Sequence, residues 1–223
     1  SALSRQFQLP LFEDLGSGWL GVVEPAPASL GDEPSVRASL RAGADLVAFS
    51  GDKLLGSTQG GLIVGRHDLV DSLRKHPLYR ALRADKLCLA ALEATLESHR
   101  RGAAITELPV LRMLSLTLPE IEERAQDLVQ SYRESSGSAR FKLEIIYGAS
   151  AIGGGSGPDT HPPTALIAVS HPERSAEDIE LGLRSSSPPI ITRKAQGRVL
   201  IDLRTVAPPE ERDILNALVD LYC

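Results

Sequence analysis

The chain has 223 residues, 42% of them hydrophobic, which is enough for one large domain or two small ones with real cores. A net charge of −5 and the lack of a strongly basic stretch argue against binding of DNA or RNA by electrostatics alone. Two cysteines, Cys88 and Cys223, are too few for a disulfide framework, and no apolar run approaches the ~20 residues that span a bilayer. We therefore expect a cytoplasmic protein with no membrane or DNA partner.

The first half of the chain alternates apolar runs with helical patterns, as α/β proteins do. It opens without methionine, in what reads as the tail of a helix running into a strand, so we expect a fragment of a longer protein. The strands are predicted at 9–14, 45–50 and 61–65, and the helices at 34–44, 67–76 and about 85–101. Asp85 is suited to cap the last of these helices and Gly102 to end it. Cys88 and three leucines on one face of that helix are expected in the core: Leu89, Leu92 and Leu96.

The pattern changes near residue 112, where we place a boundary between a domain of residues 1–111 and a domain of residues 112–223. The second half predicts a small α+β sandwich. Its expected elements are a helix at 119–133, strands at 140–147 and 164–170, a helix from Ser175, a strand pair at 189–204 that turns at Gln196-Gly197, and a last helix after Pro209.

Two predicted strand ends carry the residues of a candidate cofactor site. Asp14 ends the first strand, and Lys53 follows the second one after a helical crossover. Parallel strands joined in this way bring their carboxyl ends to the same edge of a sheet, where open α/β sheets bind ligands. A lysine and a carboxylate there suit pyridoxal 5'-phosphate, because the amine forms a Schiff base with the aldehyde and the acid keeps the ring nitrogen protonated. Ser50 and the amides of the glycine-rich turn after Lys53 are candidates for holding the phosphate.

A competing interpretation of the same residues is weaker. Ser50 and Lys53 satisfy the S-x-x-K pattern of penicillin-binding serine hydrolases, but those enzymes also need S-D-N and K-T-G elements and a serine that opens a helix. Neither tripeptide occurs in the chain, and Gly51 is a poor start for a helix.

Other polar residues are assigned structural roles. Arg193 and Arg204 are expected in structural salt bridges, with recognition of a substrate carboxylate as the alternative. The glycine run 153–155 lacks a dinucleotide-binding fingerprint and is expected to form a bend. The five histidines show no metal-ligand spacing, and most of them are expected at the surface: His67, His76, His99, His161 and His171.

Several segments together resemble the bacterial selenocysteine synthase family, the L-seryl-tRNA(Sec) selenium transferases. They are "LPLFEDLGSG", "DLVAFSGDKLLGSTQGGLIVG", "HPLYRALRADKLCLAALEATL", "LPVLRML", "IGGGS" and "SPPIITRKAQGRVLIDLRTV". The resemblance covers nearly the whole chain and corresponds to the C-terminal part of the family, without the N-terminal tRNA-recognising domain and the first part of the catalytic domain.

The resemblance implies an aspartate-aminotransferase-like (fold type I) architecture, here the C-terminal part of the pyridoxal-phosphate large domain followed by the small domain. Lys53 matches the Schiff-base lysine, and Asp14 matches the acid on the ring nitrogen. Arg80 and Arg83 match arginines placed at the active site for the anionic donor selenophosphate, and their spacing puts both on one side of a helical turn. The implied reaction converts seryl-tRNA(Sec) to selenocysteyl-tRNA(Sec) in a homo-oligomer, a dimer or a ring of dimers.

The chain departs from the family in one loop. Where the family usually has Gly-Pro and then Gln-Ala-Gly, this chain has Ser57-Thr58 and then Gln59-Gly60-Gly61. Both versions are small turn formers, so we expect the loop shape to survive. Two alternatives stay open: a related pyridoxal lyase acting on a small amino acid or amino-sugar acid, and a non-catalytic fragment that serves only in folding or assembly. We expect the isolated chain to bind the cofactor weakly or not at all.

Overall fold

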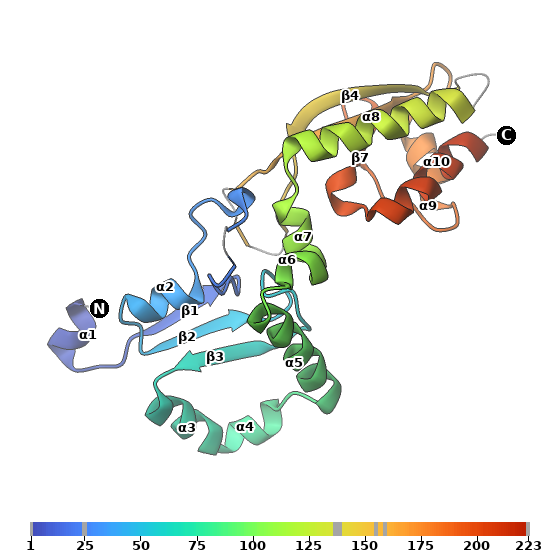
Figure 1. The fold of residues 1–223 in the computed structure, drawn as a ribbon. Helices are drawn as coiled ribbons and strands as arrows, with labels where there is room; N and C mark the ends of the chain where they lie inside the picture. Colours follow the sequence, from blue (N-terminus) through green and yellow to red (C-terminus); the bar gives the residue numbers. More distant parts are fainter. Residues whose placement is uncertain (1, 24–25, 136–139, 154–155, 158–159, 222–223) are drawn as a thin grey trace. The chain divides into compact units, whose positions relative to one another are not determined.

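The computed structural model describes residues 2–23, 26–135, 140–153, 156–157 and 160–221 (Figure 1). The chain divides into two compact units, one of Ser1–Ser115 and Ile152–Thr160, the other of Leu116–Ala151 and His161–Cys223. The expected boundary near residue 112 therefore falls inside a helix, α7 (Pro109–Ser115), which ends the first unit.

The reason for this later division lies in the packing of α7. Its residues Leu111 and Leu114 are buried in a cluster with Trp19, Leu30 and Leu54, all of them from the first unit. Ile152 packs against the same cluster, which explains why a short stretch from the second half belongs with the first unit.

The first unit is built on a three-stranded sheet in the order β1-β2-β3, with β1 at Phe12–Gly16, β2 at Leu46–Ser50 and β3 at Gly61–Gly65. Strands β1 and β2 are parallel, and the connection between them contains α2 (Val36–Arg41), whereas β3 returns antiparallel to β2. The predicted parallel pair with a helical crossover is thus confirmed. Ser35 caps α2 by accepting a hydrogen bond from the Ala38 amide at 3.1 Å.

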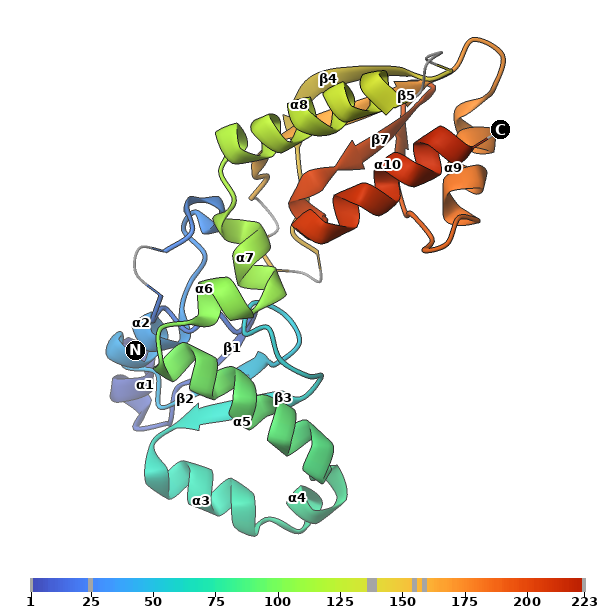
Figure 2. The same cartoon turned by 45° about the vertical axis from the view of Figure 1, so that its right-hand side comes forward.

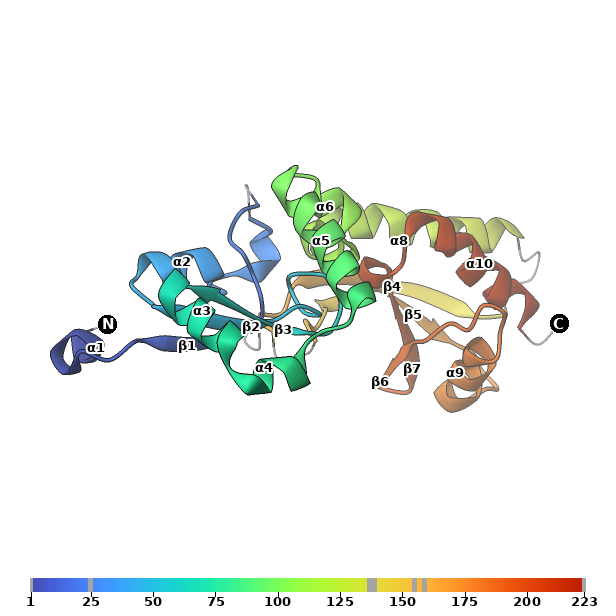
Figure 3. The same ribbon diagram turned by 90° about the horizontal axis from the view of Figure 1, so that it is seen from below.

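The two faces of this sheet differ. Val47 and Phe49 are buried with Val36 of α2, and Leu92 of α5 (Lys86–Arg100) packs against the same cluster. Figure 3 shows α2 and α5 on the same side of the strands. Because side chains alternate along a strand, Asp14, Ala48 and Ser50 point to the opposite face. Among the described residues that face is open, since Phe12 and Ile63 on it are 55% and 44% exposed.

The remaining helices of the first unit include the predicted ones and several short ones that the sequence did not reveal. Beside α1 (Ala2–Phe7), the 3-10 helix η1 (Ala28–Leu30), α3 (His67–Lys75) and α5, the chain forms α4 at Pro77–Leu82 and α6 at Ala104–Glu107. Asp85 caps α5 by accepting from the Cys88 amide at 2.8 Å, and Gly102 follows its end with φ at +73°, as predicted.

The expectation that one face of α5 belongs to the core is wrong in part. Leu89 and Leu96 are 52% and 39% exposed, and the side chains of α5 that are buried are polar: Thr95, Ser98 and His99. Cys88 is half-buried, with its Sγ 3.8 Å from the Thr58 hydroxyl. Periodicity places leucines on a common face, but it does not say whether another layer covers them.

The second unit is a four-stranded antiparallel sheet in the order β4-β5-β7-β6, with helices packed against it. Figure 2 shows α8 and α10 side by side along the sheet, and Arg124 of α8 joins Glu211 of α10 at 2.6 Å. The elements are α8 (Leu118–Ser135), β4 (Lys142–Ala149), β5 (Pro163–Ser170), α9 (Ala176–Arg184), β6 (Arg193–Ala195), β7 (Arg198–Asp202), η2 (Leu203–Thr205), η3 (Pro208–Glu210) and α10 (Glu211–Asp220).

The α+β sandwich predicted for the second half is confirmed in its local signals. Ser175 and Asp178 form a capping box at the start of α9. Gln196 and Gly197 turn the β6–β7 hairpin with positive φ values of 51° and 70°, the conformation of a tight hairpin turn. No helix in the described part of the chain is long and apolar enough to cross a membrane.

Candidate active site

A tight loop carries Lys53 from the end of β2 to the start of β3. This loop, residues 51–60, is closed by its own backbone: the Gly51 amide donates to the Gly60 carbonyl at 2.8 Å, and the Ser57 amide donates to the Gly51 carbonyl at 2.8 Å. The Gly56 amide also donates to the Lys53 carbonyl at 3.0 Å. The segment after Ser50 is therefore a turn and not a helix start, which agrees with rejecting the S-x-x-K interpretation.

Two leucines directly after Lys53 anchor this loop in the first unit. Leu54 and Leu55 are 1% and 0% exposed, and they enter two different apolar clusters. The Leu54 amide donates to the carbonyl of Ser17, just beyond β1, at 2.9 Å. On the other side, the imidazole Nε2 of His99 lies 3.1 Å from the Leu55 carbonyl oxygen. The chain around Lys53 is thus held between the end of β1 and helix α5.

Lys53 itself is half-buried and makes no hydrogen bond or ion pair with the described part of the chain. Its Nζ lies 3.8 Å from the position that a Cβ would take at Gly16, the last residue of β1. The amine therefore extends over the end of the neighbouring parallel strand, at a residue that has no side chain to fill the space. An unpaired and partly desolvated amine is the state that reaction with an aldehyde requires.

Asp14 and Ser50 lie on the same open face of the sheet. Asp14 is paired with Ala48 in the β1–β2 register, is exposed, and has no hydrogen-bond or charged partner among the described residues. The structure corrects one detail of the prediction, because β1 continues to Gly16 and Asp14 lies two residues before its end. The strand is extended by pairing with β2, which the apolar pattern of residues 9–14 did not reveal.

Arg80 and Arg83 are both exposed and without partners in the described part of the chain. Helix α4 contains Arg80 and ends at Leu82, and Arg83 follows in an extended conformation with ψ at 127°. Arg83 is the C-cap residue of α4, with φ at −61°, so it stands three residues after Arg80 at the end of the same helix, and the expected placement of both guanidinium groups on one side of a turn stays a prediction. Their proposed role at a site for an anion does not depend on that turn and stays a prediction.

The arginines of the second half are held inside the second unit. Arg204 is 4% exposed and donates to the carbonyls of Leu116 and Pro163, each at 2.7 Å, and to the Ser150 hydroxyl at 3.0 Å. Burial lowers the pKa of its guanidinium, against the opposing effect of Asp202. Arg193 lies 3.6 Å from an Asp202 oxygen. Both arginines thus have the structural contacts that were expected. Of the glycine run, 154–155 lie outside the described residues.

The sequence missed two polar groups in or against the loop that carries Lys53. His99 is only 8% exposed, so the expectation of surface histidines fails for it, because a helix can turn a single polar ring inward. Ser57, one of the residues that depart from the family pattern, has a buried hydroxyl with no hydrogen-bond partner in the described structure. A buried hydroxyl of this kind is a spare donor for a phosphate oxygen. The Lys53 amine, unpaired among the described residues and close to the Cβ position of Gly16, fits reaction with a small aldehyde, and the spare Ser57 hydroxyl belongs to the loop that follows it.

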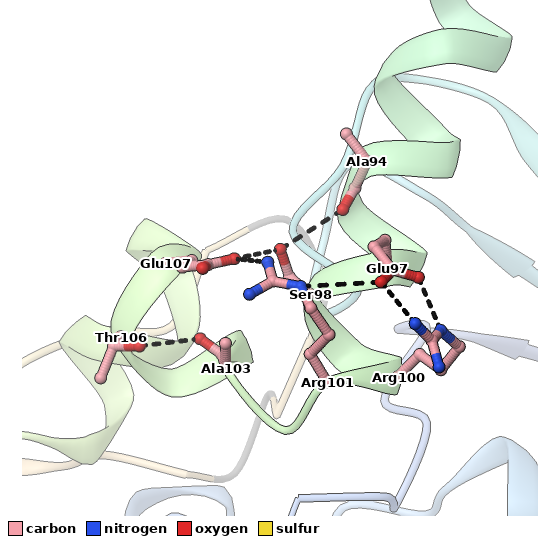
Figure 4. Close-up of polar contacts among 8 residues, drawn as sticks. All are labelled: Ala94, Glu97, Ser98, Arg100, Arg101, Ala103, Thr106 and Glu107. Carbon is pink, nitrogen blue, oxygen red and sulfur yellow. Dashed lines mark hydrogen bonds and ion pairs between the residues drawn. The ribbon is translucent and has the colours of Figure 1, made fainter.

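The C-terminal end of α5, which carries His99, is fixed to α6 by an ionic network (Figure 4). Glu107 accepts from the Ser98 hydroxyl at 2.5 Å and from Arg101 at 2.6 Å, and Arg100 donates twice to Glu97, each at 2.6 Å. Hydrogen bonds from Arg101 and then Ser98 hold the pKa of the Glu107 carboxyl below its usual value.

The parallel strand pair that carries Asp14 and leads into Lys53 is part of an α/β fold of the aspartate-aminotransferase-like class. The fold agrees: a solved structure described as D-glucosaminate-6-phosphate ammonia-lyase aligns with 99% of this chain and 51% of that chain, with a TM-score of 0.58 and 21% identity. The expected fold class is thereby confirmed.

The family follows from sequence comparison. The profile described as L-seryl-tRNA selenium transferase matches residues 1–207, and the chain belongs to this family. Proteins named L-seryl-tRNA(Sec) selenium transferase from Geobacter sulfurreducens and Clostridium perfringens are 41% and 42% identical to it over 221 residues. These alignments cover 99% and 98% of the chain but 47% of each relative, so the chain spans about half the length of the curated relatives that it matches.

Proposed function

We propose that this chain supplies the lysine-bearing half of the active site of a pyridoxal-phosphate-dependent selenium transferase. The enzyme would convert seryl-tRNA(Sec) to selenocysteyl-tRNA(Sec) with selenophosphate as donor. In the net reaction the Cβ–O bond of the seryl group and the P–Se bond of selenophosphate break, a Cβ–Se bond and a P–O bond form, and phosphate is released. The observation that carries the proposal is the unpaired Nζ of Lys53, 3.8 Å from the Cβ position of Gly16 at the end of a parallel strand.

Each residue of the site has a part in this proposal. Pyridoxal phosphate, when bound, supplies the electron sink that makes the α-proton of the seryl group acidic and its β-hydroxyl a leaving group. Lys53 would hold the aldehyde through its amine, and the same amine is the base that would take the α-proton. Asp14, exposed and unpaired, holds the proton on the ring nitrogen. Ser50, the loop amides and the spare hydroxyl of Ser57 bind the phosphate.

The site needs more than these residues. Arg80 and Arg83 present two free guanidinium groups for the anionic donor. With a net charge of −5, the chain offers little attraction for tRNA, so recognition of the tRNA is assigned to a region outside residues 1–223. We further propose a homo-oligomer, a dimer or a ring of dimers, because enzymes of this class complete each site with residues of a second protomer. An aminoacylated tRNA as substrate places the reaction in the cytoplasm.

The proposal is tested on the protein as the cell makes it. It is incubated with pyridoxal phosphate, reduced with borohydride and digested, and the modified peptide is mapped. We expect a single labelled site at Lys53, no label in Lys53→Ala, and normal labelling in Lys75→Ala, whose lysine is an exposed one at the end of α3. Labelling spread over surface lysines, or equal labelling of Lys53→Ala, would refute the assignment.

Activity assays on the same protein then distinguish the possible reactions. Formation of selenocysteyl-tRNA from seryl-tRNA and selenophosphate is measured beside deamination of small amino acids and amino-sugar acids. A selenium transferase should lose at least tenfold in kcat/KM on Arg80→Ala or Arg83→Ala, since an anion loses a charged hydrogen bond worth about 1.5–3 kcal/mol, while Lys53 is still labelled. Turnover of free amino acids without tRNA would instead support a lyase, and no turnover of either kind would support a non-catalytic role.

A further inference from the structure

A buried histidine makes direct contact with the lysine-bearing loop. His99 extends from α5 with 8% of its surface exposed, and its Nε2 lies 3.1 Å from the carbonyl oxygen of Leu55, two residues after Lys53. A carbonyl oxygen can only accept a hydrogen bond, so the ring donates from Nε2. The other ring nitrogen, Nδ1, is buried and has no hydrogen-bond partner in the described part of the chain.

This contact differs from the other anchors of the loop. The loop closes on itself through backbone hydrogen bonds, and Leu54 joins the Ser17 carbonyl through its amide. Among the described residues, two side chains of α5 make polar contacts with residues 51–60: His99, whose Nε2 lies 3.1 Å from the Leu55 carbonyl, and Cys88, whose Sγ lies 3.8 Å from the Thr58 hydroxyl. Of the two, His99 holds the backbone of the loop. Burying an imidazole away from water costs free energy that burying an apolar side chain does not. The hydrogen bond from His99 to the Leu55 carbonyl offsets that cost.

The position of His99 is itself well defined. The neighbouring residues Ser98 and Arg101 are both bound to Glu107 of α6, which holds the last turn of α5 in place (Figure 4). The Leu55 side chain, 0% exposed, fixes the loop from the other side. The His99 donor and the Leu55 carbonyl are therefore both already held in place by other contacts. A hydrogen bond between two fixed groups costs little conformational entropy.

We infer that His99 is a positioning residue for the reactive lysine: it fixes the Leu55 carbonyl and thereby the direction in which Lys53 leaves the loop toward Gly16. This inference rests on the proposed function. His99 does not touch the reacting atoms in this scheme and acts through the loop. In this inference the hydrogen bond restrains the Leu55 carbonyl, because Nε2 supplies a donor at the right position. The shape of the imidazole ring is not required.

Three substitutions separate the hydrogen bond from packing. In His99→Gln the amide nitrogen lies about as far along the side chain as Nε2 and can still donate to Leu55. In His99→Phe the volume stays similar and the donor is lost. His99→Asn keeps a donor on a side chain too short to reach. His161→Gln, at an exposed histidine of the second unit, is the matched control.

The first measurement needs no cofactor: amide hydrogen exchange of a peptide covering residues 50–61 in the full protein. Loss of one buried hydrogen bond should speed exchange there about tenfold in His99→Phe and His99→Asn, with His99→Gln and His161→Gln close to the parent protein. Equal exchange in all variants would overturn the inference. So would an increase in His99→Gln as large as that in His99→Phe, because packing alone would then explain the effect.

The second measurement is the rate at which Lys53 captures pyridoxal phosphate, read from the visible band and from borohydride labelling. We expect capture about tenfold slower in His99→Phe and restored in His99→Gln. If the parent protein does not label at Lys53, the proposed function fails, whereas the exchange result still decides whether His99 holds the loop. Trp19 fluorescence identifies variants that do not fold, and if His99→Phe is one of them, the comparison of His99→Asn with His99→Gln decides.

Discussion

Gly18 offers the sharpest test of how the end of β1 meets the end of β2. Its φ of +75° is a left-handed conformation, and a Cβ added there would lie 2.5 Å from the Ser50 carbonyl oxygen and 3.2 Å from the ring of Phe49. Both contacts are with the strand that leads into the lysine-bearing loop. Gly18→Ala therefore requires the backbone of one strand end to move away from the other.

Two costs add up in this substitution. A residue with a Cβ loses roughly 1–2 kcal/mol in the left-handed conformation. Forcing a methyl group against backbone in a packed interior costs typically about 1–3 kcal/mol more. We expect Gly18→Ala to lower the free energy of unfolding by about 2–5 kcal/mol. The matched control is Gly102→Ala, in the same unit, because Gly102 has a φ of +73° and no atom within 4 Å of its Cβ position.

Urea unfolding followed by tryptophan fluorescence measures both variants. Trp19 is the one tryptophan in the sequence and is 5% exposed, so its signal reports on the first unit. Gly102→Ala should show the conformational cost alone, and the difference between the two variants isolates the approach to Ser50. If Gly18→Ala loses no more stability than Gly102→Ala, the close approach of the two strand ends is not a constraint on this site.

Two further predictions concern charge. The Leu11 amide and then the Arg66 guanidinium lower the pKa of Asp45 from its ordinary value of 3.8, so its contribution to stability is complete above that value and is lost as the pH falls through the lower folded-state pKa. Asp45→Asn should therefore unfold at lower urea than the parent at pH 7 by Trp19 fluorescence, and a gap that does not shrink as the pH falls below 3.8 would contradict the linkage. Arg204→Met leaves two buried carbonyl acceptors and Asp202 without their cation. We expect the free energy of unfolding of the second unit, followed by circular dichroism, to fall by roughly 3–5 kcal/mol, with an unchanged Trp19 transition in the first unit. A loss below about 1 kcal/mol would show that Arg204 is dispensable there.

Local signals in the sequence predict the structure correctly where the conformation of a short segment depends only on neighbouring residues. The caps at Asp85 and Ser175 and the turn at Gln196-Gly197 depend on bonds within a few residues, and all three are found as predicted. The parallel pair around Lys53 was also predictable, because a helix between two short apolar runs allows few other arrangements.

Errors arose where distant segments decide the outcome. The exposure of Leu89 and the burial of His99 on the same helix depend on what packs against each side of α5, and helical periodicity carries no information about that. The boundary was misplaced because α7 is held by Trp19 and Leu30, residues far earlier in the chain.

By itself, the sequence determined the fold class, the order of its main elements and the identity of the residues that resemble a pyridoxal-phosphate site, since propensities, caps and motifs are written in neighbouring residues. Only the tertiary structure decided that the Lys53 amine is free among the described residues, that it lies over Gly16, and that the His99 ring meets the Leu55 carbonyl of the same loop. These properties depend on distances between atoms that strand pairing and core packing bring together, and no local pattern encodes such distances.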